Sequence, residues 1–428
     1  MVYKTEIKNK LFGSKLFKDS FWAVFGNGIG NALLLLSGIL IARFLGKDLY
    51  GEYGVVKTTM FYIASFATFG LGFTSTKYIA QYINNKKKYV KCIVRDSLEI
   101  TLLFSSFIAF FLILFSAPLA NFVNEPGLKM PFQALAIVVV FKAVTTTQIG
   151  ILAGFKDFKI SAVNSFLSGI VMLLLCVPLT FYLGLSGSLL ALLLSQFFNT
   201  LLNYLSIRKM LKSLIDQKKR DFKKELFKFS FPVALQESSF TICHWTAVML
   251  LTKYASVGEL GLYSAGAQWN SIVLMIPSLL NNVVLSYLSG TVENDKLHDK
   301  TVNNMILINL VTTLVPFVFV YIFADFIAGF YGKSFVGLPK LMRIMVFTTI
   351  LESCTSVFKS ELMAQGKTWL LFTLRFVRDF IFVGVVYYIL ALHSANNGAI
   401  SYAWCSVIVS LGFFLIMWIV YKCRNKIR

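Results

Sequence analysis

Charge is scarce in this sequence of 428 residues, because Asp, Glu, Lys and Arg together make up only 14% of it. A soluble domain of average composition carries about 25% of these residues. Hydrophobic residues reach 57%, and the mean hydropathy is strongly positive. This composition excludes the soluble classes and predicts an all-α polytopic membrane protein.

Cysteine and histidine patterns are also sparse. The six cysteines are scattered without a CxxC pair, and the three histidines form no cluster with them. This spacing argues against a disulfide framework or a metal site, so we interpret the cysteines as helix-packing thiols. No nucleotide-binding loop and no nucleophile arrangement occurs. The sequence therefore predicts no catalytic residue, no cofactor and no metal, and a function other than that of an enzyme.

Apolar segments of about twenty residues, the length that spans a bilayer, recur throughout the chain. The first follows a lysine-rich start with no cleavable signal peptide, so we expect it to remain as the first helix. Lipid offers no partner for a free peptide group, so each span must be helical. The predicted spans, about twelve in number, are 20–43, 53–83, 95–117, 131–153, 160–183, 186–207, 229–252, 261–289, 303–329, 338–363, 369–391 and 397–421.

Lysine and arginine lie mostly on one side of these spans. The termini and the connections on their side hold 28 of them, and the opposite connections hold six. The positive-inside rule then predicts that both termini are cytoplasmic. It also accounts for the net charge of +21, so we expect no nucleic-acid partner.

The two halves of the chain resemble each other at an offset of 210 residues. Leu16–Lys18 falls on Leu226–Lys228, and Gly51 falls on Gly261. We therefore predict two six-helix lobes, 1–208 and 229–428, joined by a basic cytoplasmic linker, 209–228. An even number of spans gives parallel repeats, a transporter architecture with its site between the lobes. A scaffold without a substrate could carry the same duplication.

Charged residues occur inside the predicted spans, where each lipid-facing charge costs on the order of 3 kcal/mol. The cations are Lys57, Lys77, Lys142, Arg343, Lys359, Arg375 and Arg378, and the acids are Glu237, Glu352, Glu361 and Asp379. Near the cytoplasmic end, Lys77, Lys359 and Glu361 are expected to extend to the headgroups. Arg375 and Asp379, four residues apart, could form a structural pair. The central charges must face protein or a wet cavity.

A polar stripe marks the first helix of each predicted lobe. Asn27 and Asn31 share one face, and the repeat carries Asn27 onto Glu237, which shares its face with His244. Lys142, with threonines on its own face, and Glu352 lie equally deep in their spans. We expect these residues to face a central cavity, and hydrogen bonding between helices stays open as the alternative.

One phrase after the first span resembles a known family. The residues are Ile39–Gly46, with sequence ILIARFLG, and Tyr50–Gly54, with sequence YGEYG. They resemble the Wzx-type polysaccharide flippases, which share a superfamily with the multidrug-and-toxin exporters. Lys47 stands where such families usually have proline.

This resemblance implies a V-shaped pair of six-helix bundles that opens alternately to each side. The implied substrate is an undecaprenyl-pyrophosphate-linked oligosaccharide (an O-antigen or similar repeat unit) moved to the periplasmic leaflet of the bacterial inner membrane during lipopolysaccharide biosynthesis. Membrane lipids and the polysaccharide polymerase and chain-length machinery are the implied partners.

Two groups of site residues follow from these expectations. Cations suit a pyrophosphate group, and the expected substrate path comprises Lys142, Arg375, Arg378, Lys57, Arg43, Asn27 and Asn31. The chain has no ATP-binding sequence, so an ion gradient is a candidate energy source. The residues expected to couple to it as an antiporter are Glu237, His244, Glu352 and Asp379.

Three other functions remain open. A multidrug exporter of the same superfamily should have an acidic cavity, whereas cations outnumber acids in these spans. A membrane glycan polymerase or ligase should carry a large outer loop, but the longest here is roughly 118–130. A scaffold without a substrate would not need charges at mid-membrane depth.

Overall fold

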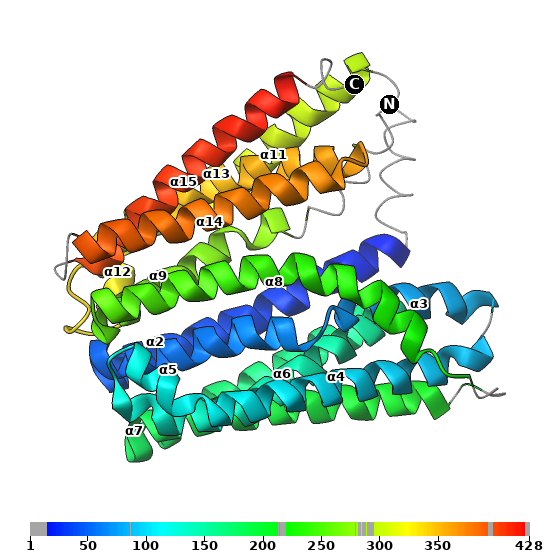
Figure 1. The fold of residues 1–428 in the computed structure, drawn as a ribbon, viewed down its shortest axis with the longest axis horizontal. Coiled ribbons are helices and arrows are strands. Elements are labelled where there is room, and N and C mark those ends of the chain that lie inside the picture. The colour runs from blue at the N-terminus through cyan, green and yellow to red at the C-terminus, as the bar shows by residue number, and fades with distance from the viewer. Residues whose placement is uncertain are drawn as a thin grey trace. The chain divides into compact units, whose positions relative to one another are not determined.

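Helices make up the regular structure of the described chain (Figure 1). The computed structural model describes residues 15–85, 87–212, 214, 220–278, 280, 284, 288, 295–392 and 397–423. No strand occurs among these residues. The first-half helices are α2 Lys15–Ala67, α3 Leu71–Asn85, α4 Val90–Leu114, α5 Ser116–Phe122, α6 Lys129–Gly154 and α7 Phe158–Lys212, with short 3₁₀ turns η1 Lys87–Tyr89 and η2 Pro126–Leu128. The later helices are α8 Lys223–Tyr254, α9 Val257–Val273, α11 Asp295–Ile322, α12 Ala324–Gly329, α13 Leu338–Ala364, α14 Thr368–Leu392 and α15 Gly398–Lys422.

The chain divides into two compact units. Unit 1 comprises Met1–Ile41 and Val56–Thr241, and unit 2 comprises Ala42–Val55 and Ile242–Arg428. Two helices therefore contribute to both units: α2 lends Ala42–Val55 to unit 2, and α8 changes unit after Thr241. The division at 209–228 expected from the duplication stays a prediction.

Unit 1 is built around α6, which packs against α3, α4 and α7. The contact with α3 is a backbone contact, because a Cβ atom added to Gly150 would lie 2.1 Å from the carbonyl oxygen of Gly72. Buried apolar side chains from these helices and from the start of α8 form one core, which includes Leu71, Ile93 and Ile151. The site residue Lys142 lies on α6 and is therefore held by the most enclosed helix of the unit.

Unit 2 is built in the same way around α13, which packs against α9, α11 and α15. Its core includes Val302, Phe358, Leu371 and Met417. Glu352 lies on α13, at the position that an offset of 210 residues assigns to Lys142. The central helix of each unit therefore carries one charge at the same depth.

Helix ends recur with this offset. α6 ends at Gly154 and α13 at Ala364, while α7 and α15 end at Lys212 and Lys422. The C-terminal hydrogen bonds of α6 also recur, because Asp157 N donates to Leu152 O at 3.0 Å and Lys367 N donates to Leu362 O at 2.9 Å. Each bond closes around a residue with positive φ, as a helix-ending motif requires. The duplication seen in the sequence therefore extends to local backbone geometry.

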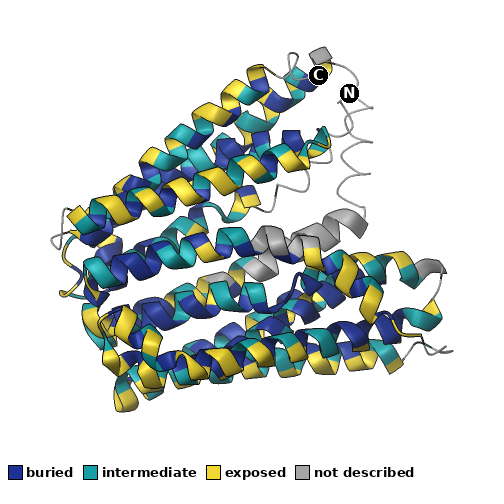
Figure 2. Ribbon diagram, viewed as in Figure 1, coloured by how far each residue is buried: buried dark blue, intermediate teal, exposed yellow. Residues whose placement is uncertain are grey.

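Seven helices within the described ranges are long and apolar enough to cross a membrane. Two of these seven are long enough to hold two predicted spans each. α2 is kinked at Gly46 and α7 at Gly184, where the sequence separates the two spans. Large apolar side chains such as Phe110, Phe181 and Val315 are exposed, as lipid contact requires. Figure 2 shows exposed positions along the outer faces of the helices. The predicted all-α polytopic membrane fold is confirmed. The predicted span 53–83 is not one helix, because Phe69 and Gly70 adopt positive φ and separate α2 from α3.

Candidate functional site

A small polar cavity lies within unit 2. Its volume is about 100 Å³, which is room for a few waters or one dehydrated cation. Five helices supply its walls, and the lining residues are His244 on α8, Tyr263 and Asn270 on α9, Met345, Thr348 and Glu352 on α13, Phe382 on α14, and Tyr402, Ala403 and Ser406 on α15. Two of the predicted ion-coupling residues, His244 and Glu352, therefore share one cavity.

Asp379 connects this cavity to the cations of α14. Its Oδ1 atom lies 3.7 Å from Nε2 of His244 and accepts a 2.8 Å hydrogen bond from Nε of Arg378. The Asp379 side chain is almost fully buried. The His244 ring also stacks on Phe382, with ring centroids 5.3 Å apart. A third predicted ion-coupling residue therefore contacts the cavity wall, and Arg378 joins the acid that was expected to pair with Arg375.

Two cationic side chains lie close to the aromatic ring of Phe413 on α15. The Arg378 guanidinium lies 4.9 Å, and the Lys359 ammonium 5.9 Å, from the centroid of Phe413. Lys359 also lies within electrostatic range of Arg375. We call Lys359, Arg375 and Arg378 the cationic cluster. It brings together both predicted arginines and a lysine that the sequence reasoning had assigned to the headgroup region.

Lys142 holds the equivalent depth in unit 1. Its side chain is partly buried and makes no ion pair or hydrogen bond with any residue that the structure describes. The neighbouring threonines are occupied elsewhere: Thr145 Oγ1 lies 2.8 Å from Thr200 Oγ1, and Thr146 donates to the Lys142 carbonyl. An ammonium group without a counter-charge among described residues, held inside a spanning helix, is available to bind an anion.

The remaining predicted site residues are less informative. Lys57 is partly buried on the unit 1 part of α2, and Arg43 is exposed on the α2 segment that belongs to unit 2. The side chains of Asn27, Asn31 and Glu237 lie outside the described residues. Their predicted roles stay predictions.

Glu361 does not extend to the headgroups, so that expectation was wrong. Its side chain is 1% exposed, and Oε1 lies 3.4 Å from Nε2 of His298, which is also buried. Gln365 donates a further hydrogen bond to the same oxygen. Such partners offset the cost of burying a carboxylate. The hydropathy profile gave no indication that His298 would be a partner of Glu361.

Asn270 is the cavity residue that sequence reasoning missed. Its Oδ1 atom is buried and has no hydrogen-bond partner among the residues described. An unsatisfied oxygen in a cavity that Glu352 and four hydroxyl-bearing residues also line suits a cation or a water molecule. An amide inside the apolar predicted span 261–289 was the available signal.

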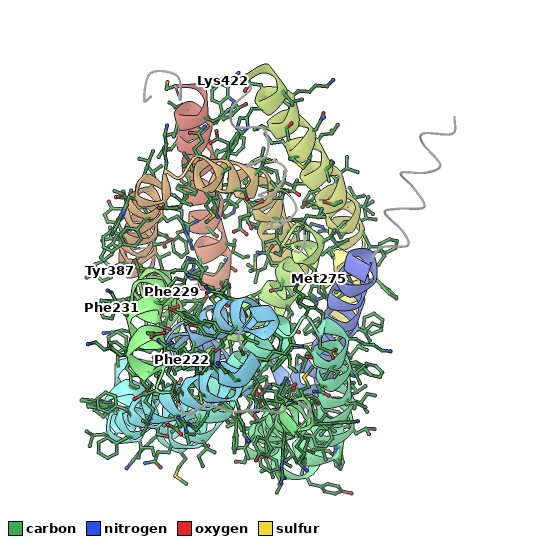
Figure 3. All side chains as sticks on the ribbon, turned by 90° about the vertical axis from the view of Figure 1, so that its right-hand side faces the viewer. Phe222, Phe229, Phe231, Met275, Tyr387 and Lys422 are labelled. Carbon is green, nitrogen blue, oxygen red and sulfur yellow. The ribbon has the colours of Figure 1, made fainter. Side chains whose placement is uncertain are left out.

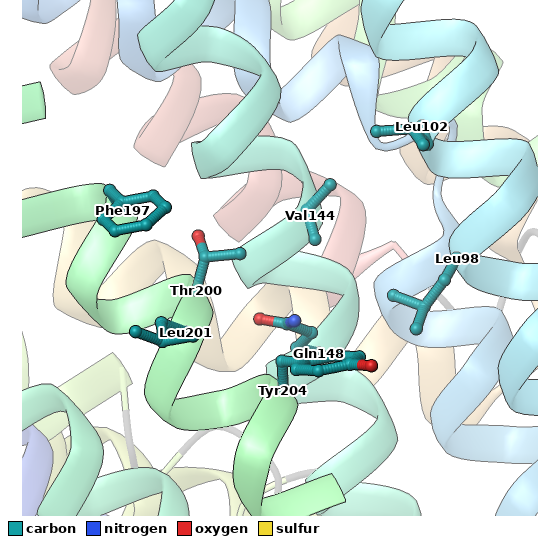
Figure 4. Close-up of a pocket in the computed structure, with 8 residues that line it drawn as sticks. All are labelled: Leu98, Leu102, Val144, Gln148, Phe197, Thr200, Leu201 and Tyr204. Carbon is teal, nitrogen blue, oxygen red and sulfur yellow. The ribbon is translucent and has the colours of Figure 1, made fainter. Parts of the chain in front are cut away.

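A second hollow lies within unit 1, between α4, α6 and α7, and has a volume of about 240 Å³ (Figure 4). Its walls are largely apolar, with Leu98, Leu102 and Phe197 among them. None of the predicted site residues lines it. This hollow therefore does not compete with the charged residues as a candidate transport site.

Comparison with known proteins gives the family. The model of the polysaccharide biosynthesis protein family matches residues 16–291, which is more than half of the chain. The chain belongs to this family. It is also 21% identical, over 94% of its own length and 97% of the relative's, to a Shigella flexneri protein named "Putative O-antigen transporter".

Solved structures share the fold. A multidrug resistance MATE family transporter of the MOP superfamily, in an inward-facing conformation, has a TM-score of 0.78 at 16% identity and covers 93% of this chain and 96% of its own. A MATE structure in a bent conformation has a TM-score of 0.67 at 17% identity, with coverages of 97% and 98%. The resemblance to polysaccharide flippases is confirmed, and the relatives are transporters rather than enzymes.

Proposed function

We propose that this protein moves a polyprenyl-pyrophosphate-linked oligosaccharide, of the undecaprenyl type, from the cytoplasmic to the periplasmic leaflet of a bacterial inner membrane. Membership of the polysaccharide biosynthesis family and the name of the Shigella flexneri relative support a glycan as cargo. The cationic cluster is the observation that carries the proposal. A pyrophosphate is the part of such a cargo that these side chains can bind.

The charges of the cluster explain why an anion would enter. Arg378 is neutralised by Asp379, but Lys359 and Arg378 face the same ring, and Arg375 adds a third positive charge within electrostatic range. Like charges held this close in a spanning segment repel each other, and a pyrophosphate relieves that repulsion. Guanidinium groups bind phosphate oxygens through paired hydrogen bonds. Lys142 supplies a further cation on the central helix of unit 1.

The polar cavity is the proposed energy-coupling site. A proton on His244 or Glu352, or a sodium ion between Glu352 and Asn270 Oδ1, would change the charge beside Asp379. Asp379 neutralises Arg378, so this change alters how strongly Arg378 holds pyrophosphate. Ion binding and substrate release would then be linked through one carboxylate. A multidrug exporter that takes cationic drugs is the alternative, and a surplus of positive charge is less compatible with that cargo.

The proposed cargo can be tested by complementation in cells from which the gene for this protein has been deleted. Wild-type protein should restore surface glycan, and the deletion should accumulate single lipid-linked repeat units on the cytoplasmic side. Lys359→Gln and Arg375→Gln should lower surface glycan while protein abundance in the membrane stays at the wild-type level. Lys367→Gln, which removes a lysine from the turn after α13, serves as the matched control. Normal glycan in all the cluster variants would contradict the cationic path.

A further inference from the structure

A basic hollow lies at the start of α8, within unit 1 and separate from the cavity described above. Its volume is about 610 Å³. One wall is Ile100 on α4, and the others are the residues Lys223, Lys224, Phe227, Lys228 and Phe231. Positions 224, 227, 228 and 231 follow the i, i+3, i+4, i+7 spacing, so they form one stripe along the helix.

The lysines of this stripe differ in their partners. Lys223 Nζ lies 2.7 Å from Oε2 of Glu99, which also pairs with Arg95 at 3.6 Å. Lys224 and Lys228 are exposed, and neither makes an ion pair with any side chain that the structure describes. They lie one turn apart on the same face. The hollow therefore has two ammonium groups with unmet charge along one edge.

Aromatic rings supply its apolar part. The side chains of Phe227 and Phe231 are 49% and 52% exposed. Phe231 can be located by its label in Figure 3. The Phe227 ring stacks on Phe69 with centroids 4.8 Å apart, and Phe69 contacts Phe104 at 4.7 Å. These contacts hold the exposed rings in place. Exposed phenylalanine beside lysine is the arrangement found where a helix meets both acyl chains and headgroups.

The start of α8 is itself fixed. The buried carboxylate of Asp96 accepts a 2.8 Å hydrogen bond from Phe222 N, and Phe222 is fully buried. Next to the lining residue Phe231, Thr74 Oγ1 lies 2.7 Å from Ser230 Oγ. The hollow therefore has a rigid floor and needs no reorganisation to receive a ligand.

We propose that this hollow binds an anionic phospholipid of the cytoplasmic leaflet, with its phosphate between Lys224 and Lys228 and an acyl chain along Phe227 and Phe231. Charge complementarity argues for the phosphate, and the exposed rings argue for a lipid over a soluble anion. The start of α8 follows the basic linker, on the side of the spans that is predicted to be cytoplasmic and therefore to meet the anionic leaflet. This site does not depend on which cargo the protein moves.

Purified full-length protein in neutral detergent tests the proposal, with phosphatidylglycerol as the probe and lipid-dependent change in melting temperature as the measurement. The variant Lys224→Gln/Lys228→Gln should weaken the apparent affinity about 25-fold, since each surface lysine contributes about a factor of five. The matched control is Lys87→Gln/Lys91→Gln, which removes two other exposed lysines four residues apart, and it should bind like wild type. Phe231→Ala should weaken binding of the lipid without changing the melting temperature of the lipid-free protein.

Three results would overturn this assignment. Equal loss of affinity in both double variants would show general surface attraction instead of a site. Equal stabilisation by phosphatidylcholine would show that the phosphate charge is not recognised. Displacement by millimolar glycerol phosphate, with no effect of Phe231→Ala, would identify a soluble-phosphate site instead of a lipid site.

Discussion

Asp379 and His244 are joined across two helices, with Oδ1 of the carboxylate 3.7 Å from Nε2 of the imidazole. The same oxygen accepts a hydrogen bond from Arg378. One buried acid therefore contacts both the wall of the polar cavity and a member of the cationic cluster. A change of charge at His244 can reach Arg378 through this single carboxylate, which is the physical basis for the proposed coupling of ion and substrate.

Glu352 gives the sharpest test of that coupling. It makes no ion pair or hydrogen bond with another described side chain, although its charge acts on Lys359, so Glu352→Gln removes a charge and breaks no such contact. We expect substrate-stimulated proton or sodium flux in proteoliposomes to fall roughly tenfold, with the melting temperature unchanged. Asp325→Asn, an exposed acid, is the control. Equal flux in wild type, Glu352→Gln and Glu237→Gln would remove both acids from the mechanism.

The glycines of the family phrase have a structural role that substitution can test. A Cβ atom on Gly51 would lie 1.9 Å from the carbonyl oxygen of Val257, where α2 crosses α9 within unit 2. Gly51→Ala should therefore destabilise the protein by about 3 kcal/mol or more, measured as a lower melting temperature and lower abundance. Gly384→Ala is the matched control, because nothing lies within 4 Å of its added Cβ. Equal melting temperatures would contradict this close contact.

Topology can be tested without engineering cysteines. Five cysteines are buried, and Cys423, after the end of α15, is exposed. A membrane-impermeant thiol reagent should label wild-type protein in inside-out vesicles and leave it unlabelled in intact spheroplasts, and Cys423→Ser should abolish labelling. Labelling of Cys423 from outside would reverse the predicted orientation of the whole chain.

The buried pair of Glu361 and His298 should matter for stability rather than transport. Glu361→Ala removes the buried carboxylate beside His298, and we expect a loss of about 1–3 kcal/mol in the free energy of unfolding. Asp325→Ala removes an acid that pairs with Arg343 at an exposed position, so its effect should stay within about 1 kcal/mol. Thermal melting of the two variants gives the comparison. Similar melting temperatures would show that the buried pair contributes no more than a surface pair.

Much of the fold followed from hydropathy and charge. Apolar length predicted the spans, and the kinks at Gly46 and Gly184 fall where the sequence separates neighbouring spans. The break at Phe69–Gly70 could not be predicted, because the apolar run continues through it and only the backbone dihedral angles reveal the turn. Hydropathy indicates whether a segment lies in lipid or in water, and it does not indicate the backbone conformation of each residue.

The sequence predicted which residues belong to the site and did not predict which of them contact each other. Residue type and depth identified His244, Glu352 and Asp379 as candidates, and the structure brings them to one cavity and its wall. The same reasoning assigned Lys359 to the headgroups, because a position near the end of a span permits either an outward or an inward side chain. Only packing against Phe413 decides between them.

Translocation by purified protein tests the central claim most directly. Proteoliposomes holding a fluorescent polyprenyl-pyrophosphate-linked oligosaccharide would be scored for arrival of the label in the opposite leaflet, for wild type, Lys142→Gln, Lys359→Gln/Arg375→Gln and the control Lys367→Gln. We expect wild type and the control to move the lipid at equal rates, and the other two variants to be slower by about tenfold or more, since charge-assisted phosphate contacts contribute about 1.5–3 kcal/mol each. Wild-type rates in all four proteins, or no translocation by wild type, would contradict a cationic path for a pyrophosphate-linked glycan.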